Sequence, residues 1–345
     1  MLSTSDFDFE LPTELIASHP LTQRDASRML VVNDGAIQDR HIRDFLDYIQ
    51  DGDVVVFNNS RVIPARFMAD GKHEITLHTA TKDGCWWGLC RKFTKIKAGT
   101  ILTLDDGTQI QVVSQNHDSG LKIKFLCDDV FAVLDRVGKM PLPPYMKREE
   151  QSDDRERYQT VYAQPLGSMA APTAGLHFTP ELLEQIRARG AQIVNITLHV
   201  GAGTWMPVKT EDLSEHKMHS EWGRITAAQA QIINDATRVI AVGTTSMRLL
   251  ESAAKYNRNP AKYRRVAPFC RTTSIFITPG YEFRAVDVLL TNFHLPKSTL
   301  FMLVSAFAGL DEMKNAYSHA VAEKYRFFSY GDCCLLFKKD LPHEI

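Results

Sequence analysis

The sequence predicts an α/β main domain built from both ends of the chain, with a small all-β domain of antiparallel, barrel-like form inserted between them. Helix and strand patterns alternate through residues 1–61 and again through residues 151–345, whereas residues 62–150 contain short strand patterns separated by turns. The length of 345 residues also exceeds what one typical core organises, which favours two domains.

The opening segment contains two expected helices and one expected strand. A helix is expected over Leu11–Ala17, because Pro12 suits an early helical position. A second helix is expected over Ile42–Ile49, before a turn at residues 51–52. The run Val54–Phe57 that follows is apolar throughout, which is typical of a buried strand.

The middle of the chain predicts a small antiparallel barrel or sandwich. Turn pairs such as Asp83–Gly84 and Asp106–Gly107 separate short runs of alternating polar and apolar residues. The runs are Ile75–His78, Trp86–Cys90, Ile101–Leu104, Ile110–Val113 and Leu121–Phe125.

The α/β pattern returns in the remainder of the chain. Thr179 caps a helix that has Pro180 at its first position and ends at Gly190. Further helices are expected over Thr226–Thr237, Ser246–Tyr256, Leu300–Ala308 and Glu312–Tyr325. Strands are expected over Ile193–Leu198, Val239–Val242 and Ile275–Ile277.

Composition bounds the class of protein. The formal net charge of −1 argues weakly against a nucleic-acid partner, although a local basic patch stays compatible with one. The six cysteines form no C-x-x-C pair, so reduced thiols are expected. No signal-peptide pattern opens the chain, and the apolar stretch Thr299–Leu310 is shorter than the ~20 residues that span a bilayer. A cytoplasmic protein without membrane contact is therefore expected.

Three loops combine glycine with hydroxyl or imidazole groups, whereas phosphate-loop, dinucleotide, nucleophile-elbow and H-E-x-x-H motifs do not occur. The loops cover residues 167–178, 199–204 and 243–248. Small residues let a backbone approach a ligand, and a glycine-rich turn after a strand is where open α/β sheets bind ligands. The alternative for each loop is a tight packing turn or a helix cap.

Charged and titratable clusters leave further alternatives open. His216, His219 and Glu221 lie in one short span without a further metal ligand, so no metal site is expected. Two basic clusters suit a phosphate backbone or, alternatively, a solvated surface. They contain Arg91, Lys92, Lys95 and Lys97, and Lys262, Arg264 and Arg265.

Nine segments in order along the chain resemble one family. They read FDFELP (7–12), RDASR (24–28), RVIPAR (61–66), RYQTVY (157–162), AAPTAGLHF (170–178), HVGAGT (199–204), GTTS (243–246), TNFHLP (291–296) and YRFFSYGD (325–332). The family is the S-adenosylmethionine:tRNA ribosyltransferase-isomerases of queuosine synthesis, and the resemblance spans nearly the whole chain. The chain differs from the family pattern at residues 69–71, 91–94 and 274.

The resemblance implies a specific reaction. The ribosyl part of S-adenosylmethionine is transferred to 7-aminomethyl-7-deazaguanine at the wobble position of tRNA and is isomerised to an epoxycyclopentane. Adenine and methionine leave, and the product is epoxyqueuosine in tRNA. S-adenosylmethionine is the co-substrate, no metal or redox cofactor is implied, and the anticodon stem-loop of tRNA is the partner. No obligate protein partner is evident.

The resemblance also implies roles for particular residues. His177, His199 and His294 are candidate acids or bases, and Asp287 or Asp332 would orient one of them. Arg248 is expected near the methionine carboxylate, and Phe178, Trp205 or Phe293 would stack a base. The donor site is expected to include Gly167, Ser168, Thr173, Gly175, Phe178, Gly201, Gly203, Thr204, Gly243, Thr244, Thr245, Ser246 and Asn292.

Two other classes of function share part of this pattern. A methyltransferase, or another nucleotide-using α/β enzyme, has similar glycine-rich loops, but a methyltransferase would leave S-adenosylhomocysteine rather than adenine and methionine. A non-catalytic RNA-binding module would use the inserted β domain without consuming the donor. The hydroxyl, imidazole and carboxylate groups outside that domain argue against the binding module.

Overall fold

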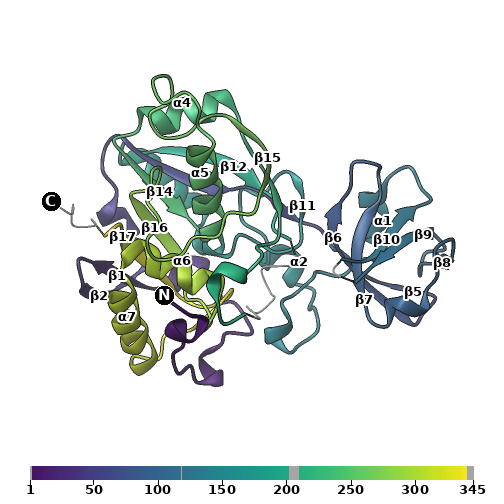
Figure 1. The fold of residues 1–345 in the computed structure, drawn as a ribbon. Coiled ribbons are helices and arrows are strands. Elements are labelled where there is room, and N and C mark those ends of the chain that lie inside the picture. The colour runs from purple at the N-terminus through teal and green to yellow at the C-terminus, as the bar shows by residue number, and fades with distance from the viewer. Residues whose placement is uncertain (1, 118, 202–209, 340–345) are drawn as a thin grey trace.

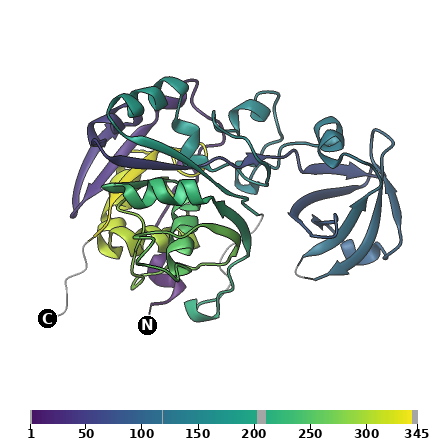
Figure 2. The ribbon, with the colours of Figure 1, turned by 90° about the horizontal axis from the view of Figure 1, so that it is seen from above.

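The computed structural model describes residues 2–117, 119–201 and 210–339. A larger α/β domain holds both ends of the described chain, and a smaller β domain stands to one side of it (Figures 1 and 2). The predicted fold class is confirmed, since one mixed sheet takes strands from both ends of the chain and a six-stranded antiparallel sheet is inserted between them. The boundaries at residues 61–62 and 150–151 stay a prediction.

A nine-stranded mixed sheet organises the larger domain, in the order β15-β13-β12-β3-β14-β16-β17-β1-β2. Its centre is parallel, because β12, β3, β14 and β16 run in one direction, while β17 is antiparallel to β16. The strands are β1 (Arg28–Asn33), β2 (Ala36–His41), β3 (Asp53–Asn58), β12 (Gln192–Leu198), β13 (Glu221–Ile225), β14 (Arg238–Val242), β15 (Phe269–Thr273), β16 (Val288–Asn292) and β17 (Cys333–Phe337).

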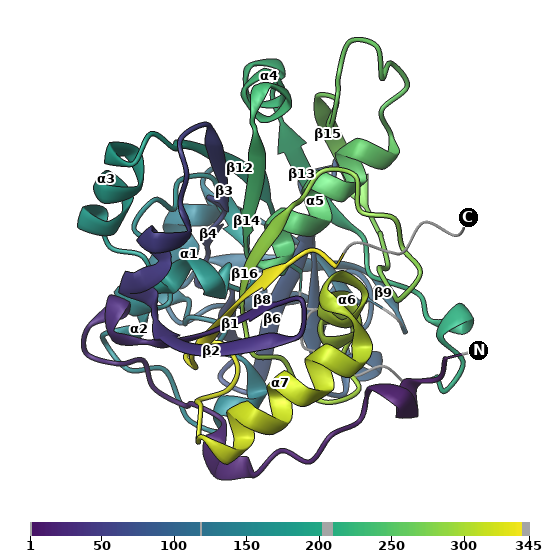
Figure 3. The same ribbon diagram turned by 90° about the vertical axis from the view of Figure 1, so that its left-hand side faces the viewer.

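Both faces of this sheet are buried, as a strand such as β3 shows. Val54 and Val56 belong to one hydrophobic core, while Val55 and Phe57 belong to the other, because successive side chains point to opposite faces. Figure 3 shows α3 on one side of the sheet and α5 and α6 on the other. The first core is covered by α4 (Ala227–Asp235), α5 (Thr244–Lys255), α6 (Thr299–Ala308) and α7 (Leu310–Ala322); the second by η4 (Ile42–Tyr48), η7 (Thr173–His177) and α3 (Pro180–Ala188).

The smaller domain is a nearly closed antiparallel barrel in the order β5-β6-β7-β10-β9-β8. An antiparallel bridge between Ala69 and Leu104 brings its two edges together. All five strands predicted from the sequence are present, and β5 and α1 are additional. The elements are β5 (Arg66–Ala69), β6 (His73–Ala80), β7 (Trp86–Cys90), β8 (Ile101–Thr103), β9 (Gln109–Asn116), β10 (Gly120–Phe125) and α1 (Val130–Val137).

Short elements connect these two parts. The parallel pair of β4 (Arg61–Val62) and β11 (Leu166–Ser168) lies where the chain leaves the larger domain and returns to it. The others are η1 (Thr4–Phe7), η2 (Thr13–Leu15), η3 (Arg24–Ala26), η5 (Phe93–Lys95), η6 (Pro144–Met146), α2 (Asp154–Arg157) and η9 (Leu213–Glu215). Within the described ranges, no helix has the length and apolar character needed to cross a membrane.

Three local predictions were wrong. The segments expected as helices at 11–17 and 42–49 form only the 3₁₀ turns η2 and η4. Residues 275–277 form no strand, because the edge strand β15 ends at Thr273. The strands β1, β2, β13, β16 and β17 were not predicted, although β1 and β17 are as apolar as β3.

Candidate active site

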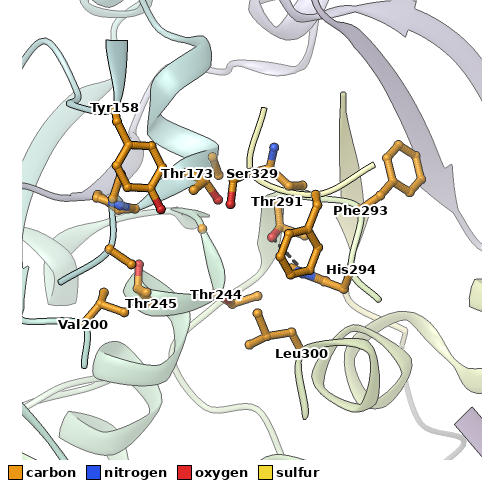
Figure 4. A pocket seen from close by; sticks show the side chains of 17 residues that line it. Tyr158, Thr173, Val200, Thr244, Thr245, Thr291, Phe293, His294, Leu300 and Ser329 are labelled. Carbon is orange, nitrogen blue, oxygen red and sulfur yellow. Dashed lines mark hydrogen bonds between the residues drawn. The ribbon is translucent and has the colours of Figure 1, made fainter. Parts of the chain in front are cut away.

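A cavity opens at the carboxyl ends of the parallel strands. Val200 follows β12, Gly243 follows β14, and Asn292 ends β16, so three of the four central parallel strands deliver residues to one edge. This is the edge at which open α/β sheets bind ligands. Figure 4 shows the side chains around the hollow. The lining residues are Tyr158, Ala170, Ala171, Pro172, Thr173, Ala174, Val200, Gly243, Thr244, Thr245, Thr291, Asn292, Phe293, His294, Leu300, Phe328 and Ser329.

His294 forms part of the cavity wall in the turn between β16 and α6. Its Nε2 atom lies 3.1 Å from the Thr291 hydroxyl, and its backbone N–H donates to the Tyr317 hydroxyl at 3.0 Å (Figure 4). Burial lowers the pKa of His294 to about 3, because the charged form is poorly solvated there. The imidazole is therefore neutral near pH 7.

His177 lies behind the cavity and contacts it through Asn292. The Asn292 amide Nδ2 is 3.1 Å from His177 Nε2, and the Ser27 hydroxyl is 3.0 Å from Nδ1. Because the amide nitrogen donates, Nε2 accepts and the ring proton sits on Nδ1. Burial and the positive charges of Arg326 and Arg24 lower the pKa of His177 to about 4. This imidazole is also neutral near pH 7.

His199 lies at the end of β12, beside the junction of the two domains. Its Nδ1 is 2.7 Å from the Ser60 hydroxyl, and its ring stacks on Trp222 with centroids 5.3 Å apart. Burial lowers its pKa. Gly167, at φ +144°, passes so close that a Cβ there would lie 2.9 Å from the ring. Glycine at 167 therefore makes room for this histidine.

The structure brings some of the expected donor-site residues to the cavity and uses others for packing. Thr173, Gly243, Thr244, Thr245 and Asn292 line the cavity. Other residues of the expected set hold turns or the core. The Ser168 and Ser246 hydroxyls donate to the backbone carbonyls of Ala170 and Val242. Gly175 packs tightly, since a Cβ there would lie 1.9 Å from the Tyr162 hydroxyl oxygen, and the backbone N–H of Gly201 donates to Glu221 at 3.2 Å. Gly203, Thr204 and Trp205 lie outside the described residues.

Neither expected carboxylate contacts a histidine. Asp332 accepts from the backbone N–H groups of Arg28 and Arg326, at 2.9 and 2.8 Å. Asp287 precedes β16, at the opposite end from the cavity, where it pairs with Arg265 at 2.8 Å. Hydroxyl and amide groups orient the three imidazoles instead. The partners of His177 and His199 were missed because they join segments far apart in the sequence, whereas Thr291 lies only three positions before His294.

Arg248 and the expected stacking residues also have other partners. Arg248 forms a buried ion pair with Glu221 at 2.5 Å and does not line the cavity. Phe178 is fully buried between Phe45 and Phe57, and Phe293 packs against Tyr317. Trp222 instead presents an exposed aromatic ring, with 37% of its area accessible. The sequence did not indicate that this ring stacks on His199.

The two basic clusters differ in how many of their side chains are exposed and free of ion pairs. Arg91, Lys92, Lys95 and Lys97 are exposed in the segment after β7 of the smaller domain. Lys262 and Arg264 are exposed before β15, whereas the Arg265 guanidinium donates to backbone carbonyls and pairs with Asp287. Arg265 therefore stabilises the fold. No group of three or more His, Cys, Asp or Glu side chains that could hold a metal ion occurs among the described residues.

The fold and the cavity define an α/β enzyme, because an imidazole, hydroxyls and an amide converge at the carboxyl edge of a parallel sheet. The chain belongs to the queuosine biosynthesis protein family, whose model matches residues 4–336.

Curated relatives and a solved structure agree with this membership. The chain is 47% identical to the S-adenosylmethionine:tRNA ribosyltransferase-isomerase of Rhodospirillum rubrum, over 97% of this chain and 98% of the relative. It is 47% identical to the enzyme of the same name from Parvibaculum lavamentivorans, over 97% and 99%. The crystal structure of S-adenosylmethionine tRNA ribosyltransferase from Thermotoga maritima matches with a TM-score of 0.55 and 35% identity, over 96% of this chain and 99% of that one.

Proposed function

We propose that this chain catalyses the reaction for which its relatives are named, the transfer and isomerisation of the ribosyl part of S-adenosylmethionine onto tRNA. The observation that carries this proposal is the 47% identity that runs over 97% of the chain and so includes every segment of the cavity. The acceptor is 7-aminomethyl-7-deazaguanine at the wobble position, and the product is epoxyqueuosine in tRNA. The reaction belongs to the cytoplasm, where tRNA is modified.

The reaction needs a base and an acid. A general base removes a proton from the carbon beside the sulfonium, because the positive sulfur makes that C–H group acidic. The bond between the ribosyl group and adenine breaks, and the departing adenine takes up a proton. The aminomethyl nitrogen forms a bond to the ribosyl carbon skeleton and loses one proton to solvent, and the carbon–sulfur bond breaks to release methionine. These steps need no oxidant, reductant or metal, so S-adenosylmethionine is the sole co-substrate.

We assign the base to His294, because its imidazole lines the cavity beside the hydroxyl of Thr291. A neutral imidazole that takes up a proton becomes an acid, so the same group can return that proton to the departing adenine. His177 is the second candidate, since Asn292 connects it to the cavity. His199 precedes Val200 of the cavity wall and stacks on the exposed Trp222, so it is suited to the acceptor.

Two surfaces are suited to the tRNA. Trp222 presents an exposed ring that is held by stacking on His199, and a splayed base stacks readily on such a ring. The exposed cations at 91–97 suit the phosphate backbone of the anticodon stem-loop.

The experiment that tests the residue assignment measures adenine release by the His294→Ala variant. General acid–base catalysis contributes about 10²–10⁴-fold, so we expect kcat to fall by at least about 100-fold. The matched control is His319→Ala, because His319 pairs with Asp39 on the surface of α7 and not at the cavity. A His294→Ala variant that is folded and within a few-fold of the unchanged enzyme would contradict the assignment.

A further inference from the structure

A second, smaller hollow adjoins the cavity and is rich in arginine. Ser329 lines both spaces, and the hydrogen bond between Asn292 and His177 joins their walls. The lining of the second hollow is Pro20, Leu21, Gln23, Arg24, Ser27, Arg157, Leu176, His177, Ser329, Tyr330 and Gly331. The arginines of the second hollow therefore lie beside the wall of the cavity.

Two arginines of the lining, Arg24 and Arg157, and a third whose charge acts on His177, Arg326, are held by backbone carbonyl groups. Arg24 donates to the carbonyls of Leu176 and Glu156, at 3.2 and 3.1 Å. Arg157 donates to the carbonyl of Thr22 at 2.9 Å, and Arg326 donates to that of His19. These contacts fix the direction of each guanidinium but leave its charge unneutralised.

No carboxylate forms an ion pair with Arg24, Arg157 or Arg326 in the described part of the chain. Two carboxylates have an electrostatic effect on these arginines without pairing with them: the charge of Glu156 stabilises the protonated form of Arg24, and that of Asp332 stabilises the protonated form of Arg326. Asp332 is already bonded to two backbone N–H groups.

Two guanidinium nitrogen atoms also lack a partner. Arg157 Nε and one terminal nitrogen of Arg326 are buried without a hydrogen bond to any described residue. Burial and the charge of Arg157 lower the pKa of Arg24, and the charges of Arg326 and Arg24 help to lower that of His177. The hollow is thus a region of excess positive charge. One donor in its wall, Arg157 Nε, is unused, and an anionic oxygen group would satisfy it.

We propose that this hollow binds the carboxylate of the methionyl part of S-adenosylmethionine, with Arg24 and Arg157 as its partners. The inference rests on the proposed function, because the donor's adenosine part must occupy the adjoining cavity. A carboxylate is favoured over a phosphate of tRNA because the hollow adjoins the donor cavity, with Ser329 in the wall of both. Arg248, expected in this role from the sequence, is neutralised by Glu221.

The test compares the binding of S-adenosylmethionine with that of its decarboxylated analogue, which keeps the adenosine, sulfonium and amine. Titration calorimetry on the unchanged protein should show about 10- to 100-fold weaker binding of the analogue, the range for a hydrogen bond to a charged group. Arg157→Gln should bind both compounds with nearly equal affinity. The matched control is Arg43→Gln, since Arg43 is exposed and pairs with Asp25, and it should keep the full discrimination.

Equal binding of the two compounds by the unchanged protein would overturn the proposal, whether or not any variant folds. Full discrimination in a folded Arg157→Gln or Arg24→Gln variant, with weakened tRNA binding, would overturn it in favour of a phosphate site. Adenine release by the unchanged protein is measured separately. Discrimination without adenine release would mean that the proposed reaction fails while the carboxylate site stands.

Discussion

Acid should destabilise this protein through its two buried, neutral histidines. Burial holds the pKa of His177 at about 4 and that of His294 at about 3, against about 6.5 in an unfolded chain. As the pH falls below 6.5, the unfolded state binds protons that the folded state does not. The stabilisation is therefore fully present above 6.5 and is lost progressively down to the folded pKa values.

The magnitude follows from these values. Between pH 7 and pH 5, each histidine removes ~2 kcal/mol from the free energy of unfolding, so that the pair removes ~4 kcal/mol. That loss is a large fraction of the ~5–15 kcal/mol that stabilises a typical protein.

Urea unfolding at pH 7 and pH 5, followed by circular dichroism, measures this loss. The comparison uses the unchanged protein and the variants His177→Gln and His294→Gln. Other titrating groups contribute to all three proteins and cancel in the difference. Each variant should be less sensitive to pH by ~2 kcal/mol. A difference below ~0.5 kcal/mol for both variants would refute the argument that the folded state keeps these rings neutral.

Three further predictions concern the site and its surroundings. Asn292→Asp removes the donor to His177 Nε2, and we expect kcat for adenine release to fall about 10-fold or more, whereas an unchanged kcat would separate His177 from the reaction. Asp287→Asn breaks the pair with Arg265, and we expect thermal unfolding to show a loss of about 1–3 kcal/mol with kcat within a few-fold; a large loss of kcat would give Asp287 a catalytic role. Lys95→Ala with Lys97→Ala should weaken tRNA binding and reduce its salt dependence by about one unit per lost phosphate contact, with kcat unchanged at saturating tRNA; unchanged binding would place the tRNA elsewhere.

The fold class was predictable because each layer leaves a local signal. Alternating residues between turn pairs marked the barrel strands, and the apolar run at 54–57 marked the centre of the large sheet. The helices expected at 11–17 and 42–49 failed for a different reason. Tertiary contacts hold these segments: Ala17 donates to the Phe327 carbonyl, and Phe45 packs on Phe178, so the backbone needs no full helical turns.

The candidate site was predictable only in part. Loops that follow parallel strands must meet at one edge, so Gly243 and Thr244, after the predicted strand Val239–Val242, were expected at the site, and they line the cavity. Asn292 also lines it, but it was expected there only from the family resemblance, because its strand β16 was not predicted. The partners of the histidines were not predictable, because Ser27 and His177 are 150 positions apart and Ser60 and His199 are 139 apart.

The prediction for Arg248 failed because its partner is also distant in the sequence. Its place beside a glycine-rich loop indicated a ligand carboxylate, but a partner from β13, Glu221, neutralises it. Local spacing gives no information on which distant carboxylate will fill such a position. The family resemblance, in contrast, depends on nine segments in order, and it is confirmed by the match over residues 4–336.

The central claim is the identity of the reaction, and the fate of the donor tests it most directly. Purified protein is incubated with S-adenosylmethionine and tRNA that carries 7-aminomethyl-7-deazaguanine, and the products are read by mass spectrometry. The account predicts that free adenine and methionine appear in step with a nucleoside that carries an epoxycyclopentane. Formation of S-adenosylhomocysteine, or tRNA binding without consumption of the donor, would contradict it.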